Sequence, residues 1–261
     1  MRSLWRQWPR VRSRIAGRGR VIFLLDFDGT LAPLASAPCR TRLPERIRVL
    51  LRRLRARPRV TVAVLSGRPL SYVRSSVGLP SLYYGGNHGL EISGPGVSFR
   101  HPGATSAGAL MQSLAGRLRT DLRSAPGAIV ENKGPTLSVH YRRVTGARLS
   151  GFKRSLRSLR RRTSALPLRW SAGHKVWEVL PRVAWNKGAA ALYLIRRLRH
   201  PYPIAVGDDR TDEDLFAALK GKGLSIRVGR KRSSRADYYL SGQGQVAEFL
   251  ALACTAMADE A

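Results

Sequence analysis

Residues 21–30, Val-Ile-Phe-Leu-Leu-Asp-Phe-Asp-Gly-Thr, decide the fold of this chain. An apolar run that ends in two carboxylates predicts a strand buried on both faces, as in a parallel sheet, with Asp26 and Asp28 at its carboxyl end. Open α/β sheets bind ligands at that end, and two like charges so close together suit a cation such as Mg²⁺. A carboxylate there can also attack phosphorus. The alternative is an ordinary strand followed by an Asp-Gly turn, and this stretch alone favours neither.

The length and composition are those of a globular protein. The chain has 261 residues, of which 43% are hydrophobic and 7% aromatic, so it can bury one core or one core and a smaller domain. It contains no apolar run near the roughly 20 residues that span a bilayer, and residues 1–20 lack the apolar region of a signal peptide. Cys39 and Cys254 form no metal-binding spacing. These features favour a cytoplasmic location.

The formal net charge of +31 raises the question of a polyanionic partner. The arginines are spread over several segments that are expected to be the polar faces of helices, which favours a solvated surface over nucleic-acid binding. Nucleic acid is kept as an alternative partner. Residues 1–20 are basic, and their apolar residues lie near helical spacing, so they predict a short amphipathic helix that packs on the domain. The alternative for this segment is a helix on a membrane surface.

The pattern of an apolar strand followed by polar groups repeats along the chain. A helix at 45–57 leads to a strand at 60–65 that ends in Ser66-Gly67-Arg68, and a strand at 82–84 leads to a glycine-rich turn that offers His88 and Glu91. A helix at 187–198, capped by Asn186, carries Lys187 in its first turn, where a cation is disfavoured unless an anion lies beside it. A strand at 202–206 ends in Gly207 and a segment with five acids in seven residues, 208–214.

Residues 105–180 have a different pattern and are expected to form an inserted α+β domain. Two α-β-β units are predicted, with helices at 105–124 and 147–165 and strands at 128–133, 136–142, 168–172 and 175–180. Strand alternation can gather Glu131, Lys133, His140, Arg142 and Glu178 on a sheet face. Such a face is either an ordinary solvated one or a surface for a polyhydroxylated ligand.

The chain contains the parts needed for phosphoryl transfer: carboxylates after one strand, Ser after the next, Lys at the start of a later helix and acids after a further strand. Asp26-Phe27-Asp28-Gly29-Thr30, Ser66-Gly67-Arg68, Lys187 and Gly207-Asp208-Asp209 resemble the four motifs of the haloacid-dehalogenase (HAD) superfamily. Within it, the segments 87–91, 131–142, 175–179 and 207–214 resemble trehalose-6-phosphate phosphatases. The resemblance covers about residues 20–252, with Asn186 where the family often has Asp and His174 where Lys is frequent.

This resemblance implies an α/β fold. Residues 21–104 and 181–261 would form a HAD-like Rossmannoid core, in which helices cover both faces of a parallel sheet. Residues 105–180 would form an inserted α+β cap. The resemblance implies hydrolysis of trehalose 6-phosphate to trehalose and phosphate, with Asp26 as nucleophile and Asp28 as general acid and base. Mg²⁺ would be held by Asp26, Asp28 (through its backbone carbonyl) and Asp208, with Asp209 and Asp212 in support. Phosphate would be bound by Ser66, Gly67, Arg68 and Lys187. Substrate contacts would come from His88, Glu91, Glu131, Lys133, His140, Arg142 and Glu178.

Two alternatives to this function remain open on the sequence. One is a HAD phosphatase for another sugar phosphate, such as sucrose phosphate or a glycosyl phosphoglycerate. The other is a basic nucleic-acid-binding protein with little catalysis, against which stands the presence of every acid that the chemistry needs. A trehalose-phosphate synthase is the expected source of substrate, and a monomer is expected.

Overall fold

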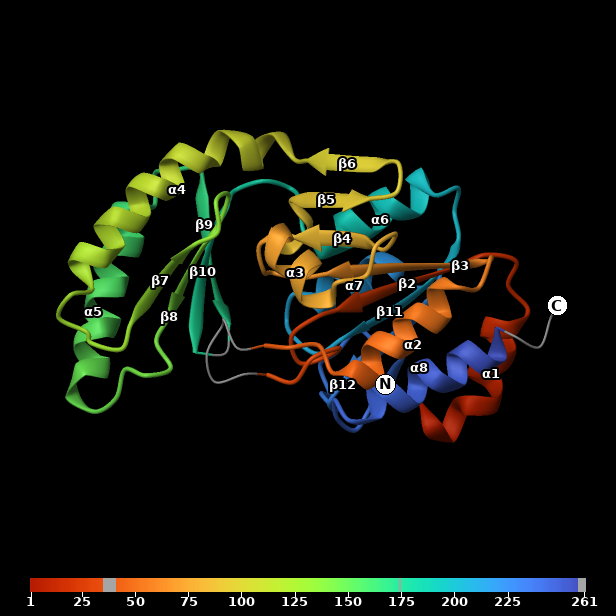
Figure 1. Cartoon of the computed structure of the whole chain (residues 1–261). Coiled ribbons are helices and arrows are strands. Elements are labelled where there is room, and N and C mark those ends of the chain that lie inside the picture. Colours follow the sequence, from red (N-terminus) through yellow and green to blue (C-terminus); the bar gives the residue numbers. More distant parts are fainter. Residues whose placement is uncertain (35–40, 174, 258–261) are drawn as a thin grey trace. The chain divides into compact units, whose positions relative to one another are not determined.

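The computed structural model describes residues 1–34, 41–173 and 175–257, so Cys39 and His174 lie outside the described residues. The chain divides into two compact units (Figure 1). The first consists of Met1–Phe99 and Trp185–Ala261, and the second of Arg100–Ala184. In the part of the chain that the structure describes, no helix has both the length and the apolar character needed to cross a membrane.

The first unit is built on a mainly parallel sheet, as the sequence predicted. Its strand order is β1-β13-β12-β11-β2-β3-β4-β5-β6. The strands are β1 (Arg2–Ser3), β2 (Val21–Asp26), β3 (Val60–Leu65), β4 (Tyr83–Gly86), β5 (Glu91–Gly94), β6 (Val97–Arg100), β11 (Tyr202–Gly207), β12 (Leu224–Val228) and β13 (Tyr238–Leu240). The central strand β2 pairs in parallel with β3 on one side and β11 on the other, and β5 is antiparallel to β4.

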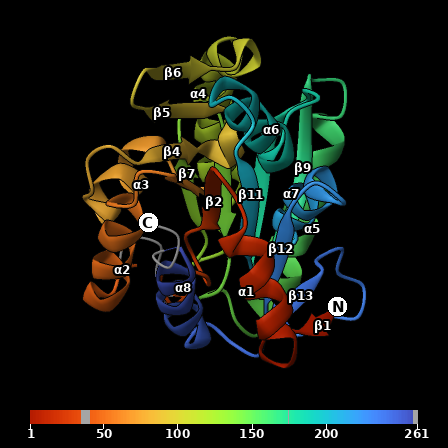
Figure 2. The same cartoon turned by 90° about the vertical axis from the view of Figure 1, so that its right-hand side faces the viewer.

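Helices cover both faces of this sheet (Figure 2). The side chains of β2 alternate, so that Phe23 and Leu25 pack in one apolar core while Ile22 and Leu24 pack in the other. The first core receives α1 (Trp8–Ala16), α2 (Glu45–Arg55), α3 (Leu70–Val77) and α8 (Gln245–Ala256). The second receives α6 (Lys187–Arg197) and α7 (Asp212–Leu219). This two-sided burial explains why β2 is an uninterrupted apolar run.

The amino-terminal segment is docked on the first unit. β1 pairs in parallel with β13, and the short 3-10 helix η1 (Trp5–Gln7) precedes α1. The side chains of Leu4, Val11 and Ile15 are fully buried, and the Trp8 ring meets Phe249 of α8 edge-on. The apolar face of this basic segment therefore packs on protein, which removes the exposed apolar surface that binding to a membrane would need.

The second unit contains two α-β-β repeats. They are α4 (Pro102–Asp121), β7 (Ile129–Asn132) and β8 (Leu137–His140), then α5 (Ala147–Arg162), β9 (Leu168–Gly173) and β10 (Val176–Pro181). The sheet is antiparallel, in the order β7-β8-β10-β9, and one face packs with both helices around a core that includes Leu118, Val139 and Phe152.

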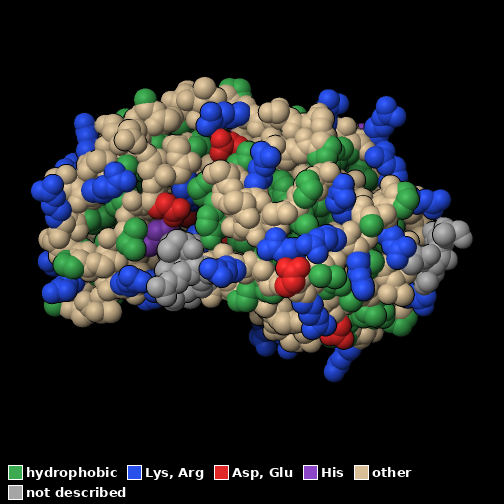
Figure 3. All heavy atoms as spheres, viewed as in Figure 1, with side chains coloured by type: hydrophobic (Ala, Val, Ile, Leu, Met, Phe, Trp, Pro, Cys, Tyr) green, Lys and Arg blue, Asp and Glu red, His purple; other side chains and the backbone are tan. Residues whose placement is uncertain are grey.

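Two details of the fold differ from the sequence prediction. The predicted strand at 136–142 ends at His140. The next residue, Tyr141, stacks on Phe152, and the chain then turns, so that Arg142 is exposed in the turn. The segment between the predicted glycine-rich turn and residue 105, for which no element was predicted, contains the strands β5 and β6, with a 3-10 helix, η3 (Asn87–Gly89), before them. Lys and Arg side chains occur over the whole face seen in Figure 3 and do not gather in one patch.

Candidate active site

Three carboxylates of the first unit converge where β2 and β11 end. Asp26 is the last residue of β2, Asp208 follows β11, and Asp212 begins α7. Each offers an oxygen atom, and these oxygens lie within 4.8 Å of one another. The parallel pairing of Leu25 with Val206 brings the two strand ends together. The chain thereby concentrates negative charge at the carboxyl edge of the sheet, the position expected for a ligand site.

Lys187 lies in the same cluster. Its Nζ is 2.5 Å from Asp26 Oδ1 and 2.8 Å from Asp212 Oδ1, and its side chain is buried. The helix that carries it is capped by Asn186, whose Oδ1 accepts a hydrogen bond from the backbone N–H of Ala189. The predicted conflict between a cation and a helix amino terminus is thus resolved by two carboxylates.

The electrostatics of the cluster follow from burial and close charges. Burial raises the pKa of Asp26 well above that of an ordinary carboxyl, against the opposing charge of Lys187. Burial, together with the charge of Asp212, raises the pKa of Asp208 to about 6. Burial by itself would lower the pKa of Lys187, but Asp212 and Asp26 outweigh it, and the pKa is raised. The site therefore holds a charged ammonium beside carboxyls whose ionised forms are disfavoured by burial, and a bound cation would relieve that cost.

The donor set fits a hard divalent cation. Asp26 Oδ2 is buried and accepts no hydrogen bond from any described residue, which is an unfavourable state for a carboxylate oxygen. Gly29 has a φ of +83°, and a Cβ built on it would lie 2.3 Å from Asp208 Oδ2. A side chain at position 29 would therefore displace the carboxylate of Asp208. Mg²⁺ is usually bound by oxygen atoms of a few carboxylates, and its other coordination positions are left for water and phosphate.

Asp28 is held apart from this cluster by a different set of partners. Arg68 Nε donates to Asp28 Oδ2 at 2.8 Å, Arg68 Nη2 donates to Oδ1 at 2.7 Å, and Thr41 Oγ1 donates to Oδ1 at 3.1 Å. The Arg68 guanidinium also lies over the ring of Tyr72. The side chains of Asp26 and Asp28 were expected to share one site, yet only Asp26 joins the carboxylate cluster.

The Ser66-Gly67-Arg68 loop is tied to the segment after β4. The backbone N–H of His88 donates to Ser66 O at 2.9 Å, and that of Asn87 to Arg68 O at 2.7 Å. Ser66 is buried, and its Oγ accepts from the N–H of Arg68. A Cβ on Gly67 would lie 2.7 Å from the His88 ring, so this buried imidazole needs glycine there.

Hydrogen bonds from neighbouring groups fix two further parts of the predicted site, Glu91 and the loop that carries Asp208. The Nδ2 of Asn87 donates to Glu91 Oε2 at 2.7 Å, at the start of β5. The backbone N–H groups of Asp208 and Asp209 each donate to Asp212 Oδ2 at 3.0 Å. Asp212 thus fixes the loop that carries Asp208, in keeping with a supporting carboxylate.

Arg227 of β12 also holds this loop, although no motif in the sequence marks it. Its Nη2 donates to the carbonyl oxygen of Asp208, and its Nη1 donates to that of Asp209 at 3.3 Å and to Glu213 Oε1 at 2.8 Å. The side chain is buried. An Arg inside an apolar strand, Leu224 to Val228, was the available signal, because a buried guanidinium needs partners.

In the second unit, four of the five predicted polar residues meet on one sheet face. Lys133 Nζ is 2.9 Å from Glu178 Oε2, and Ser138 Oγ donates to Glu178 Oε1 at 2.9 Å. His140 Nε2 is 2.8 Å from Glu131 Oε2. Ser138 pairs in register with both Glu131 and Glu178, which places these side chains together. Arg142, the fifth, lies in the turn after β8.

A family model for trehalose-phosphatases matches residues 24–243. The chain belongs to the trehalose-phosphatase family. A trehalose 6-phosphate phosphatase of Zea mays is 33% identical over 90% of this chain and 70% of its own length, and a trehalose-phosphate phosphatase of Mycobacterium avium is 35% identical over 90% and 62%. The chain therefore spans about two thirds of the length of these relatives.

Solved structures support the fold of this trehalose-phosphatase family member. The carboxy-terminal domain of the trehalose-6-phosphate phosphatase of C. albicans has a TM-score of 0.84 at 22% identity, covering 97% of this chain and 98% of that one. A haloacid dehalogenase-like hydrolase of B. subtilis has a TM-score of 0.59 at 17% identity, covering 88% and 98%. The predicted family, the HAD-like α/β fold and the enzyme class, a phosphoric monoester hydrolase, are confirmed.

Proposed function

We propose that this trehalose-phosphatase hydrolyses trehalose 6-phosphate to trehalose and phosphate through an aspartyl-phosphate on Asp26. The observation that supports this most directly is the cluster of Asp26, Lys187, Asp208 and Asp212 at the carboxyl edge of the sheet. It combines a buried carboxylate, a buried ammonium and a set of oxygens suited to Mg²⁺.

In the proposed reaction an oxygen of Asp26 attacks phosphorus while the bond from phosphorus to the sugar oxygen breaks. Asp28 gives its proton to the leaving sugar oxygen. In the second step Asp28 takes a proton from water, the water oxygen attacks phosphorus, and the bond to Asp26 breaks to release phosphate. Lys187 neutralises charge beside Asp26, and the hydroxyl of Ser66 and the N–H groups of its loop bind phosphate oxygens.

Mg²⁺ is the proposed cofactor. Asp26, Asp208 and the backbone carbonyl of Asp28 would hold it, with Asp209 and Asp212 in support. It would supply positive charge beside the phosphate oxygens. The Asp26 oxygen that lacks a hydrogen bond and the close approach of Gly29 to Asp208 support this assignment.

The second unit is the proposed cap, and its polar sheet face is the proposed sugar-recognition surface. Glu131, Lys133, His140 and Glu178 form two hydrogen-bonded pairs on this face, which is an arrangement of fixed donors and acceptors suited to sugar hydroxyls. Arg142, His88 and Glu91 remain candidates from the family resemblance. A trehalose-phosphate synthase would supply the substrate, and we propose a cytoplasmic monomer.

The first test is Mg²⁺-dependent phosphate release from trehalose 6-phosphate, compared with sucrose 6-phosphate, glucose 6-phosphate and a glycosyl phosphoglycerate. Asp26→Asn should abolish turnover, while Asp214→Asn, the same chemical change at an exposed position, should leave it near normal. Near-normal turnover by Asp26→Asn would contradict the nucleophile assignment. Preference for another ester would leave the proposed chemistry of Asp26 in place and would reject trehalose 6-phosphate as the substrate.

The second test concerns the sugar surface. Glu178→Gln removes the charge that pairs with Lys133 and Ser138. It should raise KM for trehalose 6-phosphate by about tenfold, since a hydrogen bond to a charged group is worth about 1.5–3 kcal/mol. Hydrolysis of p-nitrophenyl phosphate, which has no sugar, should be unchanged. Glu45→Gln on the exposed start of α2 is the matched control. Equal loss with both substrates would remove Glu178 from sugar recognition.

A further inference from the structure

A cavity of about 680 Å³ lies in the first unit at the amino ends of β2 and β11. It is lined by residues 18–20, by the carboxyl end of α6, by the start of β11 and by Leu219 and Lys222. The catalytic carboxylates lie at the opposite end of the same two strands. The strand from Val21 to Asp26 has six residues and its ends lie about 17 Å apart, so this cavity is distinct from the carboxylate cluster.

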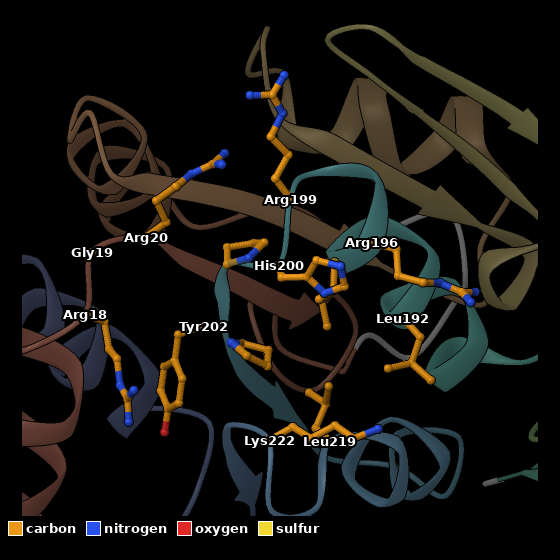
Figure 4. A pocket seen from close by; sticks show the side chains of 13 residues that line it. Arg18, Gly19, Arg20, Leu192, Arg196, Arg199, His200, Tyr202, Leu219 and Lys222 are labelled. Carbon is orange, nitrogen blue, oxygen red and sulfur yellow. The ribbon is translucent and has the colours of Figure 1, made fainter.

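The lining combines an apolar floor with a cationic rim. Ile195, Pro203 and Leu219 are buried at the floor, and Tyr202 contributes an aromatic ring. In Figure 4 the cationic side chains surround this floor; they are Arg18, Arg20, Arg196, Arg199 and Lys222. None of the described residues that line the cavity is acidic.

Three of the rim cations are not used by ion pairs among the described residues. Arg196, Arg199 and Lys222 form no salt bridge and no side-chain hydrogen bond within the described ranges, whereas another cavity, in the second unit, includes the pair Arg162–Asp121. Arg18 is ordered by its contact with the Tyr202 ring, 4.3 Å from the ring centroid. A high net charge alone would put arginines anywhere on the surface. Here four of them, together with Lys222, line one concave site with an apolar base.

The backbone at the rim has an unfavourable conformation. Arg199 and His200 both have left-handed φ values, +61° and +57°, directly after α6. Glycine is the residue that commonly ends a helix in this way, because a Cβ is disfavoured there. The chain instead places a cation and an imidazole in this turn. Strain of this kind gathers at sites that bind ligands.

We propose that this cavity is a second anion-binding site, for an organic phosphate that carries at least two negative charges beside a planar or apolar group. A nucleoside diphosphate has this chemistry. The volume is within the range of small-molecule sites, which is about 300–1,000 Å³. The cationic rim would bind the phosphates, and the floor would bury the remainder of the ligand. Such a ligand would contact α6 and β11, the elements that carry Lys187 and lead to Asp208.

The proposal is tested on the full chain without Mg²⁺ by calorimetric titration with ADP, pyrophosphate and adenosine. ADP should bind at least about tenfold more tightly than either fragment, because only ADP uses both the rim and the floor. Equal affinity for ADP and pyrophosphate would mean that charge alone is recognised and would overturn the proposal. Absence of ADP binding at millimolar concentration would also overturn it.

A matched pair of variants separates the cavity from the general positive field. Arg196→Gln/Arg199→Gln/Lys222→Gln removes three charges from the rim, and Arg46→Gln/Arg53→Gln/Arg55→Gln removes three exposed charges of α2 on the same unit. The rim variant should weaken ADP binding by at least about tenfold and the control by less than about twofold, since separated exposed charges are screened. Equal weakening would overturn the proposal.

Hydrogen exchange gives a readout that does not depend on the variants. ADP should slow exchange of backbone amides at residues 196–204. Protection confined to residues 26–30 and 66–68 would place the ligand at the catalytic carboxylates and overturn the second site.

Discussion

The guanidinium of Arg68 holds both carboxylate oxygens of Asp28, through Nε at 2.8 Å and Nη2 at 2.7 Å. In this arrangement each oxygen of Asp28 accepts a hydrogen bond from Arg68, and Oδ1 accepts a second one from Thr41. We therefore expect the contact with Arg68 to weaken when the proposed acid carries its proton to the sugar oxygen. A bidentate Arg–carboxylate pair fixes orientation as well as charge, so Arg68 is a positioning residue for Asp28 in addition to a proposed phosphate ligand.

The first prediction follows from this pair. Arg68→Gln should lower kcat for trehalose 6-phosphate by about 10- to 100-fold, because general acid catalysis contributes about 10²- to 10⁴-fold and depends on the position of the acid. With p-nitrophenyl phosphate, whose leaving group needs no proton, the loss of kcat should be several-fold smaller. Steady-state kinetics with both esters measures the difference.

Arg74→Gln is the control for this prediction, since Arg74 is an exposed residue of α3 on the same connection. It should leave both rates near normal. If Arg68→Gln lowers both rates equally, Arg68 acts on phosphate binding alone and has no separate effect on Asp28.

The second prediction concerns Arg227, which binds the carbonyl oxygens of Asp208 and Asp209. Arg227→Met should raise the Mg²⁺ concentration needed for half-maximal activity by about tenfold, a size typical of residues that orient metal ligands. Arg227→Lys should behave similarly, because one ammonium cannot reproduce the planar fork of contacts. Activity titrations with Mg²⁺ measure the effect.

Glu213→Gln separates this role from simple stability. It weakens the charge partner of Arg227 but keeps both contacts to the loop carbonyls. The variant should lower the melting temperature and leave the Mg²⁺ requirement within about twofold. An equal rise in the Mg²⁺ requirement for Glu213→Gln and Arg227→Met would contradict the positioning of Asp208 by Arg227.

The third prediction concerns the buried ammonium. Lys187→Met leaves Asp26 and Asp212 without their cation, and removing one partner of a buried ion pair costs about 3–5 kcal/mol of unfolding free energy. The melting temperature without Mg²⁺ should fall by roughly 10 °C. Adding Mg²⁺ should raise it more in the variant than in the wild type, because the ion replaces the missing charge. A variant without Lys187 that melted at the wild-type temperature would contradict this account.

The fourth prediction is a pH dependence of stability in EDTA. The pKa of Asp208 is about 6 in the folded chain and is raised by burial from 3.8, so the folded state binds this proton more tightly than the unfolded state does. Stability from this group is therefore fully present below about pH 3.8 and is lost as pH rises towards about 6, and the last part of this loss falls between pH 5 and 7. The loss is about 1 kcal/mol, or roughly 2–4 °C in melting temperature.

Asp208→Asn removes the titrating group and should flatten this slope, and Mg²⁺ should flatten it in the wild type by favouring the ionised form. Thermal melts of both chains between pH 5 and 7 test this, and the variant also accounts for histidines that titrate in the same range. Identical slopes for the two chains would assign the pH dependence to other groups.

Much of the fold was predictable because strands buried on both faces and amphipathic helices leave strong patterns. The five apolar residues before Asp26 and the spacing of Leu50, Leu51 and Leu54 indicated β2 and α2, and both form as expected. The strands β5 and β6 have only four residues each and lie at one end of the sheet, with β6 outermost. They depend on pairing within the assembled sheet, which local sequence does not encode.

The candidate site was predictable where chemistry follows a strand end. Asp26, Lys187, Asp208 and Asp212 were each expected at the site, and they lie in one cluster. The pair Arg68–Asp28 was not foreseen, because residues 40 positions apart meet only through tertiary structure. The role of Arg227 depends on the backbone of another loop, a contact that leaves no motif in the sequence.

The pairing of β2 has a consequence for synthesis on the ribosome. Val21 is paired with Val60 on one side and with Tyr202 on the other, so one edge of β2 has no partner until β11 has been made. At translation rates of about 5–20 residues per second, that edge stays open for roughly 10 to 40 s. All strands of the second unit lie between Ile129 and Pro181, so this unit can close its sheet first. The nascent chain is therefore exposed to edge-to-edge aggregation at β2, because the strand that ends in Asp26 gains its second partner only when β11 has been made.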